Sequence, residues 1–190
     1  MIVLISHYII KESTMNIRNI SITTLLTIGL TTNMSLVHAA DDQTKTVRPN
    51  LDGIELPENY KDWKVISASH RTDNKSMRII LGNDIAIKAA RSKHTNPWPD
   101  GAILGKLVWK QTAEKNWPTA IAPDEFIHAE FMIKDSVKYK ANGTGWGWAR
   151  WLGMEQKPYG DDKDLNQSCI ACHTPVKGRD WVFTTPVQLP

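Results

Sequence analysis

Cysteine is scarce in this sequence, whose 190 residues include only Cys169 and Cys172. A zinc site would need further ligands at ordered spacing, and there is no second cysteine pair. A disulfide between the two cysteines would close a very small loop and would stabilise the fold little. A thioredoxin-like dithiol follows a buried strand in a βαβ unit, and no such pattern precedes Cys169. These three explanations are therefore disfavoured.

The two cysteines belong to the segment Cys169–His173, whose C-x-x-C-H spacing is the covalent attachment signature of a c-type haem. Cys169 and Cys172 can each add to a haem vinyl group, and His173 is then held beneath the iron as its proximal ligand. We therefore predict a single covalently bound haem c, with His173 as the metal ligand.

The sequence also lacks a large excess of charge of either sign and lacks long apolar runs. The formal net charge is +3, which is too balanced to favour nucleic acid or an anionic membrane surface, so the expected partners are small molecules or redox proteins. The apolar run at 20–30 is short and rich in threonine for a membrane span. Because Arg18 precedes this run and small residues follow it, residues 1–39 are predicted to be a secretory signal peptide. Translation starts at Met1 or Met15, and an uncleaved anchor is the alternative.

Removal of the signal leaves one domain. Residues 40–54 are polar and lack periodicity, which predicts a flexible leader, and residues 55–190 are predicted to form the haem domain. Haem c is attached outside the cytoplasm, so the cofactor and the signal both indicate a periplasmic or otherwise exported protein.

Hydrophobic periodicity favours an α+β fold, with an antiparallel sheet, a few peripheral helices and a C-terminal helix that carries the haem motif. Strands are expected at 64–69, 76–81, 102–111, 125–134 and 145–152, with a closing strand at 181–184. Helices are expected at 57–63, at 84–93 with Asn83 as the cap, at 135–140, and from near Asp161 through the haem motif.

The sixth coordination position of the iron is the next question. Common electron-carrier cytochromes c take an axial methionine from the chain after the haem motif, but no methionine, histidine or cysteine follows His173 here. An open position binds small ligands at the iron, whereas a closed one favours electron transfer. We expect an open site; the candidates for a sixth ligand are His70, His94, His128, Met77, Met132 and Met154.

Two basic residues interrupt apolar strand patterns. Lys106 alternates with Leu104 and Val108 on one strand face. It is either a lysine that extends its ammonium to solvent, or a buried lysine whose lowered pKa leaves a neutral amine able to act as nucleophile or base. Arg78 poses the same question, and an arginine near the iron could donate hydrogen bonds to a bound ligand.

The order of these features resembles the cytochrome P460 family over essentially the whole mature chain. The motifs that carry the resemblance are Leu56–Trp63, Arg78, the Trp98–Gly101 turn followed by Lys106, the segment Glu130–Asp135, and the C-terminal C-x-x-C-H. The resemblance implies an antiparallel sheet with helices, a homodimer and a five-coordinate haem c.

The resemblance also implies site residues. In members that oxidise hydroxylamine to nitrogen oxides, a lysine is joined to a haem meso carbon, and Lys106 matches that position. Arg78 matches a distal-pocket arginine. A distal carboxylate assists in some members; Asp164 is the candidate by position, and Glu130 is a poorer one. The implied catalytic residues are thus Lys106, Arg78 and Asp164.

Related cytochromes c′-beta leave other functions open. They share the fold, lack the lysine link, line the distal pocket with aromatic residues and bind nitric oxide or carbon monoxide without turnover. This chain keeps the lysine but contains eight tryptophans, which core and dimer packing would also explain. Hydroxylamine oxidation, gas binding and electron transfer through a six-coordinate haem therefore remain as alternatives.

Overall fold

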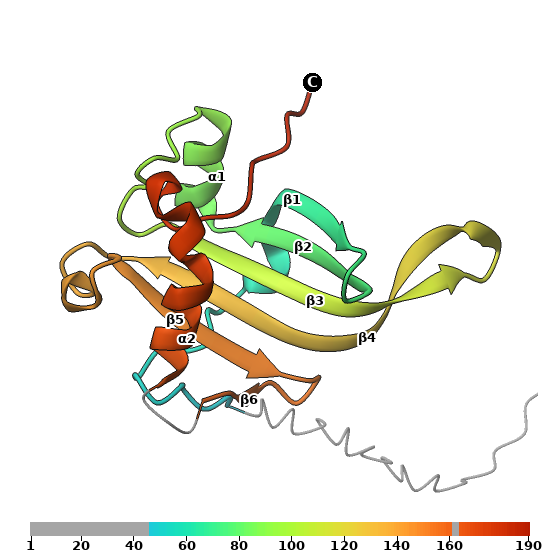
Figure 1. Cartoon of the computed structure of the whole chain (residues 1–190), viewed down its shortest axis with the longest axis horizontal. Helices are drawn as coiled ribbons and strands as arrows, with labels where there is room; N and C mark the ends of the chain where they lie inside the picture. Colours follow the sequence, from blue (N-terminus) through green and yellow to red (C-terminus); the bar gives the residue numbers. More distant parts are fainter. Residues whose placement is uncertain (1–45, 161–163) are drawn as a thin grey trace, which may run out of the picture. The chain divides into compact units, whose positions relative to one another are not determined.

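A computed structural model describes residues 46–160 and 164–190. Its centre is an antiparallel sheet in which each strand pairs with the next along the chain (Figure 1). The strands are β1 (Lys64–Arg71), β2 (Ser76–Gly82), β3 (Ile103–Glu114), β4 (Trp117–Lys134), β5 (Trp146–Leu152) and β6 (Lys157–Pro158). The α-helices are α1 (Asp84–Arg91) and α2 (Asp164–His173). The 3-10 helices are η1 (Tyr60–Asp62), η2 (Lys140–Asn142) and η3 (Thr174–Arg179). The α+β prediction is confirmed.

Most predicted strands and both longer helices are present, but three short elements differ. The predicted helix at 57–63 is only the 3-10 turn η1, and the one at 135–140 is a series of turns that leads into η2. The predicted closing strand at 181–184 is wrong. Asp180 and Trp181 have φ angles of 51° and 66°, and this left-handed backbone interrupts the extended conformation that a strand needs.

Part of the predicted leader belongs to the packed domain. The predicted leader, residues 40–54, is packed in its described part: Ile54 is buried in the core, and the Asn50 side chain donates a hydrogen bond to the carbonyl of Trp148. The signal peptide at 1–39 and the helix start near Asp161 lie outside the described residues. No helix in the described ranges is long and apolar enough to cross a membrane.

The β3–β4 hairpin is longer than its apolar pattern indicates. β4 begins at Trp117, eight residues before the predicted start, and the hairpin end projects beyond the other strands (Figure 1). Pro118 and Pro123 lie in this extension, where the pairing with β3 contains register shifts. Because this segment contains prolines and exposed polar residues, it lacks the apolar alternation by which a strand is predicted. Even its large apolar residue Trp117 is 65% exposed.

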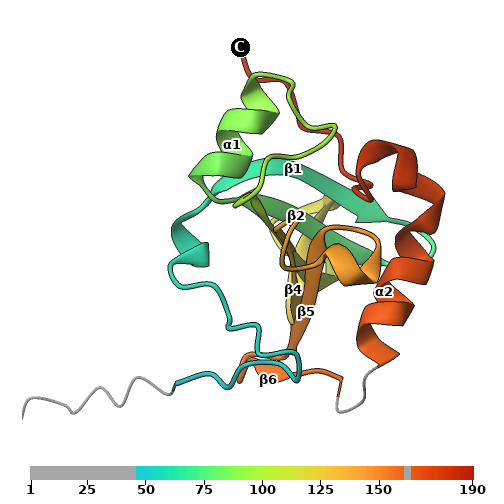
Figure 2. The ribbon, with the colours of Figure 1, turned by 90° about the vertical axis from the view of Figure 1, so that its left-hand side faces the viewer.

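The sheet separates two hydrophobic clusters. The first lies on the face covered by α1 and α2 (Figure 2) and includes Ile80, Leu104, Trp146 and Trp148. The second lies on the opposite face and includes Ile54, Tyr60, Leu81, Phe131 and Trp151. Because successive strand residues point to opposite faces, Ile80 and Leu81 belong to different clusters. This alternation also turns Lys106 and Glu130 toward the face that α2 covers.

Gly105 shows how closely the second face is packed. A Cβ atom at Gly105 would lie 2.8 Å from the ring of Phe131, a side chain that is 1% exposed. Since the buried ring has no room to move, Gly105→Ala is expected to lower the free energy of unfolding by about 1–3 kcal/mol, measured by denaturant titration. Gly178→Ala is the matched control, because nothing lies within 4 Å of its Cβ position. Equal stability of the two variants would contradict this packing.

Candidate functional site

The C-x-x-C-H motif occupies the last turns of α2, which crosses the sheet next to β5 (Figures 1 and 2). Cys169 is half-buried and packs with Ile170 against the first cluster, whereas Cys172 is exposed. The two thiols are unbridged, and burial raises the pKa of Cys169. The motif therefore presents two free thiols and one imidazole along one side of a helix.

His173 is held in a single orientation. Its Nδ1 atom lies 2.6 Å from the Trp181 carbonyl oxygen, and because a carbonyl can only accept, Nδ1 carries the proton. The ring makes edge contacts with Trp148 and Phe183, with centroids 4.7 and 4.9 Å away. Burial lowers the pKa of His173, although the bond to Trp181 acts in the opposite direction. The unprotonated Nε2 atom is thus left with a lone pair for a metal.

A row of charged residues lies on the same face of the sheet. Lys106, Glu130 and Arg150 are direct cross-strand partners on β3, β4 and β5. The Glu130 carboxylate forms ion pairs with both Lys106 and Arg150, and His128 Nε2 lies 3.4 Å from Glu130 Oε1. Glu130 is the least exposed of the three ion-pair partners, with 19% of its side chain accessible.

The protonation states in this row follow from burial and neighbouring charge. Burial disfavours the Glu130 anion, but the coulombic attraction of Lys106 and Arg150 outweighs that effect and lowers the pKa of Glu130 to about 2. Burial lowers the pKa of His128 to about 4, although Glu130 opposes this shift. At neutral pH the row therefore contains a carboxylate beside a neutral imidazole.

Arg78 adjoins this row from β2. It lies two residues from Ile80, the cross-strand partner of Lys106, and therefore on the same face. Burial lowers the pKa of Arg78, and Glu130 and the Cys172 thiol lie close enough to act in the opposite direction. The structure thus brings Arg78 and Lys106 to the side of the sheet occupied by the C-x-x-C-H helix.

A family model described as Cytochrome P460 matches residues 57–184. The chain belongs to the cytochrome P460 family. The matched range contains the sheet, both helices and the C-x-x-C-H motif. No curated protein matches the chain. As a cytochrome P460, the chain is a haem-binding cytochrome from a family known for haem-dependent catalysis.

The residues around α2 fit the haem that a cytochrome P460 binds. Two buried donors there have no hydrogen-bond partner among the described residues: Nε1 of Trp148 and Nε of Arg150. Buried donors without partners are costly, so both suit acceptors on a bound group. The two N–H groups can donate to the carboxylate substituents of a haem, and the two thiols and the free Nε2 of His173 are the groups that a c-type haem uses for attachment and ligation.

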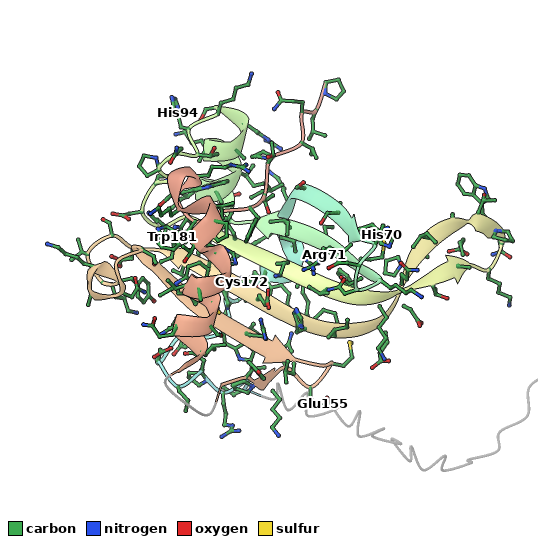
Figure 3. All side chains as sticks on the ribbon, in the orientation of Figure 1. His70, Arg71, His94, Glu155, Cys172 and Trp181 are labelled. Carbon is green, nitrogen blue, oxygen red and sulfur yellow. The ribbon has the colours of Figure 1, made fainter. Side chains whose placement is uncertain are left out.

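The remaining candidates of this cytochrome P460 are scattered. Asp164 is the first residue of α2, and its side chain lies outside the described part of the structure. His94 lies beyond α1, and His70 lies with Arg71 at the end of β1, where it contacts Gln111 (Figure 3). Met77 pairs with His70, on the opposite face from Arg78, and Met154 is 80% exposed in a turn. Of the six candidate ligands, only His128 and Met132 face α2.

Sequence reasoning missed several residues of the candidate site. Arg150 lies two residues after Trp148 in a strand, so alternation could have placed it on the face of the haem motif. No local pattern points to the Trp181 carbonyl or to the buried ion pair between Lys134 and Asp180, because these contacts join residues far apart in the chain.

Proposed function

We propose that this protein is an exported haem c cytochrome that binds hydroxylamine at an open iron position and oxidises it to nitrogen oxides. One observation carries the proposal: the fixed His173 imidazole and the Lys106 side chain lie on the same side of the sheet, where Lys106 forms a row with Glu130 and Arg150. An open iron position with acid, base and cationic side chains around it suits oxidation of a small nitrogenous ligand.

Cys169 and Cys172 would hold the haem through thioether bonds, and Nε2 of His173 would bind its iron. When bound, the haem supplies the site for hydroxylamine and accepts its electrons. Trp148 and Phe183 both contact the imidazole ring, which supports a single orientation of His173. Four of the six candidate sixth ligands lie at the surface or on the opposite face, which supports an open position over ligation by any of them: His70, His94, Met77 and Met154. His128 and Met132 face α2 and are the two candidates that could close it.

The reaction releases protons that nearby side chains can receive. Two hydroxylamine molecules give one nitrous oxide and one water, with loss of four protons and four electrons. Burial lowers the pKa of His128 to about 4, so this imidazole can take up a released proton only transiently before passing it to solvent, and Glu130, at 3.4 Å, stabilises the short-lived cation. Arg78 stays charged and can donate hydrogen bonds to the oxygen of the ligand. The electrons pass to a redox protein outside the cytoplasm.

Lys106 is the residue that we propose to be joined to the haem. The new bond from Nζ to a meso carbon replaces one N–H and one C–H bond, so two protons and two electrons leave. A two-electron oxidant of the peroxide class must therefore act during maturation. Lys106 is paired with Glu130, and an ammonium is not a nucleophile, so Lys106 must first lose its proton.

The mature protein is further proposed to work in the periplasm or another exported compartment as a homodimer. Its small net charge supports partners that are redox proteins and small ligands or gases, with neither nucleic acid nor membrane involved after signal cleavage.

The decisive experiment is peptide mapping of the holoprotein with Lys106→Ala as the comparison. In the wild type, the peptide containing Lys106 is expected to remain bound through the haem to the peptide containing Cys169. The mass of this cross-linked species should be two hydrogens below the summed masses of the two peptides and the haem. In Lys106→Ala this link is absent, and hydroxylamine oxidation is expected to fall about 10- to 100-fold, as for other residues that tune a metal centre. The Soret band should move to shorter wavelength.

Lys110→Ala is the matched control, because Lys110 is on the same strand but its side chain is 58% exposed. It should retain both the link and the activity. An unlinked Lys106 in wild-type protein that still binds nitric oxide would favour the gas-binding alternative. A six-coordinate spectrum unchanged by carbon monoxide would favour the electron carrier.

A further inference from the structure

The turn that follows η3 has an unusual backbone. Asp180 and Trp181 are consecutive non-glycine residues with left-handed φ angles of 51° and 66°. Aspartate tolerates this region, but a bulky residue such as tryptophan rarely adopts it, so surrounding contacts must hold the turn. The turn matters because the carbonyl of Trp181 accepts the hydrogen bond from His173 Nδ1 at 2.6 Å, next to α2 (Figure 3).

Three separate parts of the chain converge on Asp180. Its Oδ1 lies 2.7 Å from Nζ of Lys134, and its Oδ2 accepts from the backbone N–H of Trp98 at 2.8 Å. Its carbonyl accepts from Nε1 of Trp146 at 2.9 Å. The Lys134 ammonium also lies 5.0 Å from the centre of the Trp146 ring. The end of β4, the start of β5 and the loop before β3 thus fix this single residue.

The ion pair at the centre of these contacts is deeply buried. The side chains of Lys134 and Asp180 are 7% and 9% exposed. Desolvation of two charges offsets most of their attraction, so buried pairs are weak devices for stability alone. The pair instead fixes the orientation of Asp180. Because its carboxylate accepts hydrogen bonds from both Lys134 Nζ and the Trp98 N–H, the side chain is restrained, and the peptide group between Asp180 and Trp181 is restrained with it.

We propose that the Lys134–Asp180 pair is a positioning device for the proximal histidine. It holds the Trp181 carbonyl against Nδ1 of His173, which sets the tautomer of the imidazole and strengthens its electron donation to iron. The inference rests on the proposed function in one respect, that His173 is the axial ligand. Both residues act through the Trp181 carbonyl.

The test uses holoprotein with the double variant Lys134→Met with Asp180→Asn. A single substitution leaves one buried charge unpaired and lowers stability, whereas removal of both charges preserves folding more often. The double variant is expected to fold with haem bound, but with a lower iron–histidine stretching frequency in the ferrous state, a higher reduction potential, and faster solvent exchange of the Nδ1 proton seen by NMR.

Lys110→Met with Glu125→Gln is the matched control, because it removes an ion pair whose side chains are 58% and 66% exposed. It should leave all three readouts at wild-type values. A folded double variant with unchanged frequency, potential and proton exchange would overturn the inference. Wild-type protein whose Nδ1 proton exchanges as fast as in free histidine would overturn it without any variant.

These results are separable from failure of the proposed function. If His173→Ala left the haem spectrum and the iron–histidine band unchanged, His173 would not be the axial ligand, and the proposed function would fail at its first step. If His173→Ala removed the band while the Lys134 and Asp180 substitutions left it unchanged, only the positioning role would be wrong.

Discussion

The variant Cys169→Ser with Cys172→Ser is expected to contain no covalently bound haem. These are the only cysteines in the chain, so no other side chain can form a thioether with a vinyl group. Without the thioethers only the His173 imidazole and non-covalent contacts would hold the haem, which is too little to keep it beside Lys106 while a bond forms. Acid–acetone extraction of protein made in a haem-competent exporting host should remove all haem from the variant and none from the wild type, with intact mass as the check.

Two further variants separate the contributions of His173 and Lys106 to haem retention from that of the thioethers. His173→Ala keeps both thiols and should retain extraction-resistant haem with an altered spectrum, since only the axial ligand is lost. Adding Lys106→Ala to the double serine variant shows whether any residual attachment comes from the lysine. Covalent haem at the wild-type level in the double serine variant would refute thioether attachment, and with it the interpretation of the motif.

Local sequence patterns were sufficient to predict most of the sheet. Alternation in the strands around Ile80, Leu107 and Phe131 places every second residue in one of two cores, and each strand pairs with its neighbour in sequence. Asn83 was correctly predicted as a cap, and its side chain accepts from the Ala86 N–H at 3.0 Å. Such features depend on a few neighbouring residues, which is why the sequence alone reveals them.

Features that depend on distant contacts could not be predicted in this way. The stretch 181–184 has the apolar composition of a strand, but the bonds of Asp180 to Lys134 and Trp98 bend the chain into a left-handed turn beside His173. The extension of β4 is a strand despite its prolines, because it pairs with the end of β3 beyond the core. In both cases tertiary contacts override local preference.

In the candidate site, too, features set by neighbouring residues were predictable and features set by distant contacts were not. The motif Cys169–His173 was visible from spacing alone, and period-two alternation placed Lys106 on one strand face. The importance of Glu130 was underestimated, because its position opposite Lys106 and Arg150 depends on the register of three strands. The apolar strand pattern left two interpretations of Lys106, an ammonium extended to solvent or a buried neutral amine, and the structure instead pairs it with the cross-strand carboxylate of Glu130.

Glu130→Gln is expected to lower the free energy of unfolding at pH 7 by about 3 kcal/mol. The substitution keeps the shape of the side chain but removes the anion between Lys106 and Arg150, which then repel each other across the sheet. The magnitude follows from the pKa of Glu130, which is about 2 in the folded state against an ordinary value of 4.5. Urea titration measures it, and Glu125→Gln, whose carboxylate is 66% exposed, should change stability by less than about 1 kcal/mol.

The pH dependence tests the same ion pairs independently. Since the folded-state pKa of Glu130 lies below its unfolded value, its contribution is complete above about pH 4.5 and is lost as the pH falls toward 2. His128, with a folded pKa of about 4 against 6.5, costs stability over a higher window, as the pH falls from 6.5 to 4. Wild-type stability should therefore fall in two stages on acidification. Glu130→Gln should reduce the lower stage and retain the upper one; the Asp73 carboxylate, whose pKa the hydrogen bond from Arg71 lowers to about 2, still titrates in the lower window. A lower stage of unchanged size would show that Glu130 is not responsible for it.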